Sequence, residues 1–308
     1  MAKTSDSARL ILNGMSAQLP AVREAIFSRR QLGSKLEVQV TWEQGDAARF
    51  AQQAGRDGVS RVIVGGGDGT VNETVNGLMQ LPREQRPPLA ILPLGSANDF
   101  ATSLNLPMDP ESALDVAFTA SPQPVDVPCL GNTYYLNMLS AGFGAEVTSS
   151  TPKMLKRLLG GGAYSLMGLV KAWRYQPYYG RLRWPEGERR LPLFVLAIGN
   201  GSHAGGGQCL TPQAHLDDGL LDVLVVRHFS SLHELKQMRD ELKRLPETGA
   251  FVDYFQTSRL SFDAETQVSF TLDGELQQFA SFEVALENAG LELLAPAERC
   301  QLFSRTLP

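Results

Sequence analysis

Short apolar segments alternate with helix-like segments over the first 125 residues, and this alternation constrains the fold more than any other feature. The strand-like stretches are residues 9–12, 36–41, 61–64 and 89–94, and the helix-like stretches are 19–31, 45–55, 71–79 and 97–104. In the first helix-like stretch, Val22, Ile26 and Phe27 are expected to share one face. Strands and helices that alternate at this spacing form a parallel sheet with helices on its faces. We therefore expect an α/β domain over residues 1–125.

Beyond residue 125, strand-like segments dominate, at residues 134–139, 191–198, 220–226, 260–262, 268–272 and 282–286. One helix is expected to begin at Ser231, because Ser231 and Glu234 have the spacing of a capping box. An apolar stripe follows at helical spacing, formed by Leu232, Leu235, Met238, Leu242 and Leu245. This half of the sequence predicts an antiparallel β domain with insertions, over residues 126–289.

Composition and charge argue against several classes of protein. With 308 residues, of which 43% are hydrophobic, the chain is long enough for two domains with their own cores. The net charge of −5 argues against nucleic acid as a partner, because neutralising phosphates requires a basic face. Cys129, Cys209 and Cys300 are too far apart in sequence to suggest a disulfide framework or a zinc site. The sequence shows neither a signal-peptide core nor an uninterrupted apolar run of about 18 residues, so we expect a cytoplasmic protein.

The stretch VIVGGGDGTVNETVNGL, residues 62–78, joins an apolar strand to a helix through a glycine-rich turn around Asp68. Glycines let a ligand approach the backbone, and the first amides of the following helix lack intrahelical acceptors and attract anions. The turn is therefore a candidate phosphate-binding loop. The helix dipole contributes only about 0.3–1 kcal/mol at an exposed end, so other groups must take part. The loop matches neither the G-x-G-x-x-G pattern nor the P-loop. The alternative is a tight turn that Asp68 caps.

A second strand, glycine turn and helix start lies in ILPLGSANDFA, residues 91–101, which taken alone could be a helix with Ser96 as its N-cap. GGDGT at residues 66–70 resembles the signature of the diacylglycerol kinase catalytic-domain superfamily, which also includes sphingosine kinases and, more distantly, NAD kinases and phosphofructokinases. Residues 91–101 resemble that family's P-x-G-T-x-N-D-F-A segment, with Ser96 in place of threonine. The resemblance implies that both turns bind ATP. The residues implied are Thr41, Gly67, Asp68, Gly69, Thr70, Val71, Asn72, Glu73 and Ser96.

Two Asp-Gly pairs lie in the second half, in HLDDGLLDVLVV from His215 and in FTLDGELQ around Asp273. Each pair is a hairpin signal in its own right. For the first, the resemblance implies a structural Mg²⁺ site, with Ca²⁺ as the alternative, because a hard cation takes oxygen ligands. The ligands would be the Asp218 carboxylate and the backbone carbonyls of His215 and Leu220, with Asp217 and Asp222 as further candidates. For the second, it implies that Asp273 is the general base that takes a proton from the acceptor hydroxyl.

The motifs occur in family order over residues 41–275, and AGFGAEV (141–147) and IGNGSHAGGGQCLTP (198–212) extend the resemblance to the bacterial YegS group of lipid kinases. It implies a Rossmann-like α/β nucleotide-binding domain over residues 1–125, to which residues 290–308 can return. It also implies a C-terminal antiparallel β-sandwich domain over residues 126–289, which holds the lipid and Asp273, with the active site between the two. The implied reaction moves the γ-phosphate of ATP to a lipid hydroxyl, with phosphatidylglycerol as the first choice of substrate and diacylglycerol as the second.

Two other functions are compatible with parts of the sequence. A soluble-substrate kinase of the NAD kinase type shares GGDGT, but the sequence of the second motif, residues 91–101, disfavours it. A nucleotide-sensing protein without turnover would have no need of Asp273. No protein partner can be inferred.

Residues 151–190 combine basic and aromatic side chains, with nine Lys or Arg against two Glu. The basic residues are Lys153, Lys156, Arg157, Lys171, Arg174, Arg181, Arg183, Arg189 and Arg190, and the aromatic residues are Tyr164, Trp173, Tyr175, Tyr178, Tyr179 and Trp184. Such a mixture suits an anionic lipid interface at the inner face of the membrane. The alternative is a solvated segment with ordinary core aromatics.

Overall fold

The computed structural model describes residues 7–142, 177–204, 207–296 and 300–304. The chain divides into two compact units. The first contains Met1–Val127 together with Glu287–Pro308, and the second contains Pro128–Leu286. The chain therefore passes between the units twice, within the long strands β5 (Pro122–Leu130) and β15 (Glu275–Leu294).

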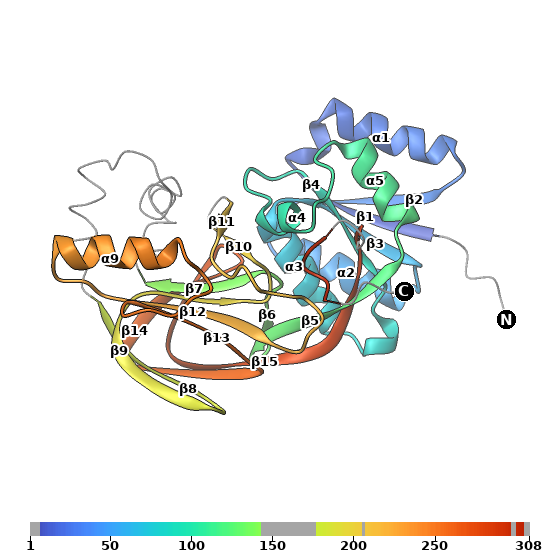
Figure 1. Cartoon of the computed structure of the whole chain (residues 1–308). Coiled ribbons are helices and arrows are strands. Elements are labelled where there is room, and N and C mark those ends of the chain that lie inside the picture. Colours follow the sequence, from blue (N-terminus) through green and yellow to red (C-terminus); the bar gives the residue numbers. More distant parts are fainter. Residues whose placement is uncertain (1–6, 143–176, 205–206, 297–299, 305–308) are drawn as a thin grey trace. The chain divides into compact units, whose positions relative to one another are not determined.

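Parallel strands form the centre of the first unit, in the order β4-β3-β1-β2, and the end of β15 pairs with β4 in parallel. The strands are β1 (Ser7–Asn13), β2 (Lys35–Thr41), β3 (Arg61–Gly66) and β4 (Leu89–Pro93). Helices α1 (Pro20–Gln31) and α5 (Pro110–Thr119) pack on one face, and α2 (Asp46–Arg56) and α3 (Asp68–Met79) pack together on the other (Figure 1). Both faces of the sheet are thus covered, which confirms the predicted α/β architecture.

Short elements complete this unit and set the strand ends. They are the 3-10 turns η1 (Ser16–Gln18) and η2 (Arg83–Gln85) and the helix α4 (Asp99–Ser103). The expected apolar face of α1 is only partly correct. Val22 and Ile26 are buried, but Phe27 is 63% exposed, because it lies beside the uncovered edge strand β2 and not over the sheet.

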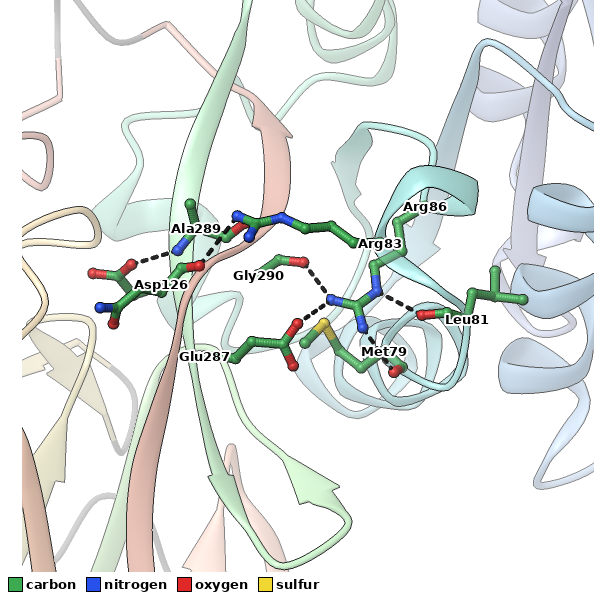
Figure 2. A network of polar contacts seen from close by, with 9 residues as sticks. Met79, Leu81, Arg83, Arg86, Asp126, Glu287, Ala289 and Gly290 are labelled. Atoms are coloured by element: carbon green, nitrogen blue, oxygen red, sulfur yellow. Dashed lines mark hydrogen bonds and ion pairs between the residues drawn. The ribbon is translucent and has the colours of Figure 1, made fainter.

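The C-terminal segment joins the first unit through polar contacts to the chain that follows α3 (Figure 2). The Arg86 guanidinium donates to Glu287 Oε1 at 2.5 Å and to the carbonyl oxygens of Gly290, Leu81 and Met79 at 2.8–3.2 Å. Its side chain is only 9% exposed. One buried cation therefore satisfies carbonyls from two chain segments that are about 200 residues apart in sequence.

The second unit is a curved antiparallel sheet in the order β13-β12-β9-β7-β14-β15, with β8 paired to both β9 and β14. Its strands are β6 (Thr133–Tyr134), β7 (Met138–Gly142), β8 (Tyr178–Trp184), β9 (Gly187–Gly199), β12 (Leu221–Arg227), β13 (Val252–Thr257), β14 (Arg259–Leu272) and the first part of β15. A separate small ribbon pairs β10 (His203–Ala204) with β11 (Gln208–Cys209).

Successive residues of the central strands pack into two different hydrophobic cores, one on each face of the sheet. The sequences of these strands are therefore continuously apolar. Val223 and Val225 of β12 join the larger core, whereas Leu224 and Val226 pack beneath helix α9 (Leu232–Leu242). The capping box at Ser231 and Glu234 is confirmed, with both of its hydrogen bonds present. Leu232 is nevertheless 63% exposed and does not belong to the buried stripe.

The single strand expected over residues 134–139 is wrong. The structure has β6 ending at Tyr134 and β7 beginning at Met138. The backbone amides of Leu136 and Asn137 between them donate to the Asp273 carboxylate instead of to a neighbouring strand. The Asp273 side chain thus replaces the hydrogen bonds that a neighbouring strand would make. No local sequence pattern could indicate this, because Asp273 lies in a hairpin far along the chain.

We predict that Arg86→Ala lowers the free energy of unfolding by about 2–4 kcal/mol, because it leaves Glu287 and three carbonyl oxygens without their donor. Arg83→Ala is the matched control, since exposed Arg83 bonds only the carbonyls of Asn288 and Ala289 and should cost less than about 1 kcal/mol. Urea denaturation of both variants is the measurement. Equal losses would show that Arg86 does not hold the C-terminal segment.

Candidate nucleotide and proton-transfer sites

The two glycine loops of the first unit touch each other through their backbones. A Cβ atom added to Gly95 would lie 2.4 Å from the Cα of Gly67, and one added to Gly67 would lie 3.1 Å from the Cα of Gly95. Neither position therefore accepts a side chain without separating the loops. Both loops leave the carboxyl ends of the neighbouring strands β3 and β4, the edge at which open parallel sheets bind ligands.

Asp68 links the two loops. One of its carboxylate oxygens accepts from the backbone amide of Asp99, the first residue of α4, at 3.4 Å. The N-cap position of α3 is Gly67, so Asp68 is the first residue of the helix. The alternative role of Ser96 as an N-cap is wrong: Ser96 is exposed, and the N-cap of α4 is Asn98. Asn98 adopts a φ of 51° and its side chain bonds both the amide and the carbonyl of Gly95, which fixes the turn.

Thr41 lies at the same edge of the sheet as the loops. It ends β2 and pairs with Asn13, the last residue of β1. The Asn13 side chain donates from Nδ2 to Thr70 Oγ1 at 3.3 Å, so a direct contact connects the end of β1 with the start of α3. Asn13 was not among the expected site residues, although an Asn-Gly pair directly after a strand is a turn signal.

The other residues expected to bind the nucleotide, Val71, Asn72 and Glu73, lie on α3, and each of them contacts a different part of the first unit. The backbone amide of Val71 donates to Gly67 within the helix, and its side chain is buried. Asn72 accepts from the side chain of Asn76 one turn later. Glu73 Oε1 accepts from the backbone amides of Ala47 and Ala48 at 2.9 and 3.4 Å. Glu73 therefore caps α2, which ties that helix to the glycine loop. Gly67, Asp68, Gly69 and Thr70 form the start of α3 itself.

Asp273 occupies the first position of a two-residue hairpin turn between β14 and β15, with φ values of 48° at Asp273 and 93° at Gly274. The hairpin reading of this Asp-Gly pair is therefore correct, and it is compatible with a further role. The carboxylate accepts three backbone amides, from Leu136, Asn137 and Met138, at 2.8–2.9 Å. These three bonds fix the position of the carboxylate within the turn.

The loop before β12 holds the expected metal ligands. Asp218 Oδ1 accepts from the Leu220 amide at 2.9 Å, and Oδ2 lies 3.8 Å from His215 Nδ1. The loop is not a hairpin, because β12 pairs with β9 and β13. Within the described ranges no group of three acidic, histidine or cysteine side chains could hold a metal ion. The donors suggested here, one carboxylate and two carbonyls, are all oxygen and suit a cation that keeps most of its water.

Asp222 is unsuited to metal binding. It is fully buried and accepts from Tyr254 Oη at 2.5 Å and from Gln256 Nε2 at 3.2 Å. Burial raises the pKa of the Asp222 carboxyl, and the nearby charge of Asp218 adds to the rise. Both oxygens are thus engaged with the protein interior.

Strand register brings the metal loop and Asp273 to one end of the second unit's sheet. Asp222 of β12 lies opposite Gly199 of β9, which in turn lies opposite Met138 of β7. The Met138 carbonyl accepts from the Asp273 amide at 3.0 Å. The two Asp-Gly turns therefore lie at the same end of the sheet, with β9 and β7 between the strands that carry them.

The basic and aromatic segment is described only from residue 177 onward; the part from 151 to 176 lies outside the described residues. Its described part forms the β8–β9 hairpin. Tyr178 and Trp184 pack on the core, as the alternative reading predicted, and Trp184 stacks on Phe255. The outer face carries a hollow of about 440 Å³ with 61% exposed Tyr179 at its side. Its charged lining is Arg181, Arg183, Arg190, Asp263 and Glu265.

Comparisons with known proteins agree with these features. Residues 7–130 match the diacylglycerol kinase catalytic domain model, and residues 137–295 match the YegS C-terminal NAD kinase beta sandwich-like domain model. The chain is 59% identical over 287 residues to a protein of Chromohalobacter salexigens named "Probable lipid kinase YegS-like", covering 93% of this chain and 92% of that protein.

Other relatives are similar over nearly the whole chain. "Probable lipid kinase YegS" of Escherichia fergusonii is 40% identical, with 95% of both chains covered. A solved structure described as a diacylglycerol kinase from Bacillus anthracis has a TM-score of 0.70 at 23% identity, covering 95% of this chain and 98% of that chain, which shows the same fold. The two domain models and the whole-length relatives establish that this chain belongs to the YegS-like family of lipid kinases, within the diacylglycerol kinase catalytic-domain superfamily.

Proposed function

We propose that the protein transfers the γ-phosphate of ATP to the hydroxyl group of a membrane lipid, with phosphatidylglycerol as the first substrate and diacylglycerol as the second. The observation that carries the proposal is the contact between the Gly67 and Gly95 loops, which leaves bare backbone at the carboxyl ends of β3 and β4. Family membership supplies the reaction class. A nucleotide-sensing role has no comparable support.

The triphosphate is assigned to the start of α3. Gly67 is the N-cap of a 12-residue helix that begins with Asp68, Gly69 and Thr70, whose first amides have no intrahelical acceptors. Thr41 and Ser96 border this position from the ends of β2 and β4. Val71, Asn72 and Glu73 support the cradle by holding the helix, through their contacts with Gly67, Asn76 and α2.

Asp273 is assigned as the general base. Its three amide bonds fix the direction of the carboxylate, and a carboxylate held in this way suits proton transfer from a substrate hydroxyl. Phosphoryl transfer otherwise relies on positioning and on stabilising negative charge. A divalent cation held by Asp218 and by the carbonyls of His215 and Leu220 would order the loop before β12, at the same end of the sheet as the Asp273 turn. The oxygen donors favour Mg²⁺, with Ca²⁺ as the alternative.

A lipid panel tests the proposal. Purified enzyme is incubated with radiolabelled ATP and vesicles that contain phosphatidylglycerol or diacylglycerol, or with NAD in place of vesicles. We expect label in a lipid product and none in NADP. Phosphorylation of NAD alone would favour the soluble-substrate kinase, and ATP binding without any product would favour a sensor.

We predict that Asp273→Asn lowers kcat by about 10²–10⁴-fold while ATP affinity is retained, because the base is lost. Asparagine tolerates the positive φ of this position, but its amide nitrogen cannot accept from the Leu136 amide. The melting temperature must therefore be measured alongside the rate. Asp240→Asn on the exposed side of α9 is the matched control. A rate loss no larger than the loss of folded protein would make Asp273 purely structural.

We predict that Gly95→Ala weakens ATP binding by at least about tenfold, since its Cβ would force the Gly67 loop away and such overpacking costs about 1–3 kcal/mol. Calorimetric titration with ATP is the measurement. Gly187→Ala serves as the control, because its Cβ would meet a side chain, that of Trp184, and no backbone of the glycine loops. Unchanged ATP affinity in Gly95→Ala would remove the loop contact from the site.

Membrane contact is assigned to the outer face of the β8–β9 hairpin. Arg183 pairs with Asp263, and Arg190 pairs with Glu265 at 3.1 Å. Arg181 lies directly opposite Arg190 in the strand register, a like-charge arrangement that an anion between them would relieve. Among the helices of the described ranges, none is long and apolar enough to cross a bilayer.

We predict that Arg181→Gln weakens sedimentation with phosphatidylglycerol vesicles about fivefold, because one basic residue near an anionic surface contributes about 1 kcal/mol. Arg56→Gln on α2, whose side chain bonds Gln52, is the control and should change nothing. Equal binding of the unmodified protein to neutral and anionic vesicles at low salt would contradict the electrostatic contact.

A further inference from the structure

Trp42 is 94% exposed, directly after Thr41 at the carboxyl edge of the first unit's sheet. Met15, which follows the end of β1, is 87% exposed. A single exposed apolar residue is ordinary on a protein surface, whereas two beside a candidate ligand site call for a partner. An indole ring in particular offers a large flat face to a ligand at little cost in conformational entropy.

The turn that carries Trp42 is rigidly held. Asp46 Oδ2 accepts from the backbone amides of Trp42 and Glu43 at 2.7 and 3.1 Å, and Oδ1 accepts from Arg49 at 2.5 Å. These bonds, with that from Trp42 first, lower the pKa of the Asp46 carboxyl to about 2. Because the pKa is depressed, the contribution of these bonds is complete above the unfolded pKa near 4 and is lost as the pH falls toward 2. The turn is therefore intact at neutral pH.

A continuous path of contacts leads from this turn to the proposed phosphate-binding loop. A Cβ added to Gly14 would lie 2.6 Å from the Thr41 carbonyl oxygen, so the chains leaving β1 and β2 run against each other. The Met15 amide donates to Asn13 Oδ1 at 3.0 Å. Asn13 Nδ2 donates in turn to Thr70 Oγ1. The exposed apolar residues Met15 and Trp42 thus lie along the same edge of the sheet as the proposed phosphate-binding loop.

We propose that Trp42, with Met15 beside it, forms the stacking surface for the purine base of the nucleotide whose phosphates bind at Gly67–Thr70. This inference rests on the proposed ATP site. A purine is an uncharged, flat and largely apolar group that matches an indole face, and a thioether packs well against aromatic rings.

The charge of the turn favours a base over a membrane as the partner of Trp42. Glu43 directly follows the tryptophan, and its carboxylate would be repelled by an anionic bilayer surface. An uncharged ring meets no such repulsion. The contact of Asn13 with Thr70 also connects this surface to the phosphate loop.

The test compares ATP with inorganic tripolyphosphate, which has the phosphates but no base, by calorimetric titration of the full chain. We expect Trp42→Ala to weaken ATP binding roughly 5- to 150-fold, the range of one base–aromatic stacking contact. Tripolyphosphate affinity should stay unchanged, and Trp42→Phe should retain most of the ATP affinity. Leu32→Ala, which removes a 74% exposed side chain of the same unit, is the control and should leave both affinities unchanged.

Three results would overturn the inference while leaving the proposed kinase intact. They are unchanged ATP affinity in Trp42→Ala, an equal loss of ATP and tripolyphosphate affinity, or a loss of vesicle binding with ATP affinity retained. The last would assign Trp42 to a bilayer. An unmodified protein that binds neither ATP nor tripolyphosphate would instead remove the proposed function, and the base site with it.

Discussion

The backbone contact between Gly67 and Gly95 is the constraint on which the ligand edge of the first unit depends. β3 and β4 pair in parallel up to Gly66 and Pro93, and the Leu94 amide still bonds the Gly66 carbonyl at 2.9 Å beyond them. The chains leaving the two strands therefore remain about one strand spacing apart, roughly 4.8 Å. Only glycine fits at the point of closest approach. Because glycine has no side chain, the loops can touch, and a phosphate can reach their backbone amides.

Carboxylates that accept backbone amides hold the turns around both candidate sites. Asp46 fixes the turn after β2, Glu73 caps α2 from α3, and Asp68 connects the first glycine loop to α4. In the second unit Asp273 gathers three amides between β6 and β7. Each of these bonds replaces a missing backbone partner where regular secondary structure stops. A phosphotransferase benefits, because its catalysis depends mainly on fixed positions of charge.

Local signals predicted well wherever the deciding interactions were local. The alternating pattern predicted the α/β unit, Ser231 and Glu234 predicted the start of α9, and Asp273-Gly274 predicted a hairpin. Prediction failed where distant chain segments decide the outcome. The break between β6 and β7 depends on a carboxylate about 136 residues away in sequence. That Asn98 and not Ser96 is the N-cap of α4, and that Phe27 is exposed, likewise depends on which neighbours the fold supplies.

By itself, the sequence determined the types of the elements, the glycine turns and the family. Hydrophobic periodicity, turns that need glycine and short motifs all depend on residues that are close together in the sequence. It did not determine which carboxylates are free to act on a ligand, since that depends on which amides reach each oxygen after folding. Tertiary structure decided that Asp222 is buried against Tyr254, that Glu73 holds α2, and that Trp42 stands in solvent beside Thr41. These outcomes arise from burial and strand register, which bring together residues that are far apart along the chain.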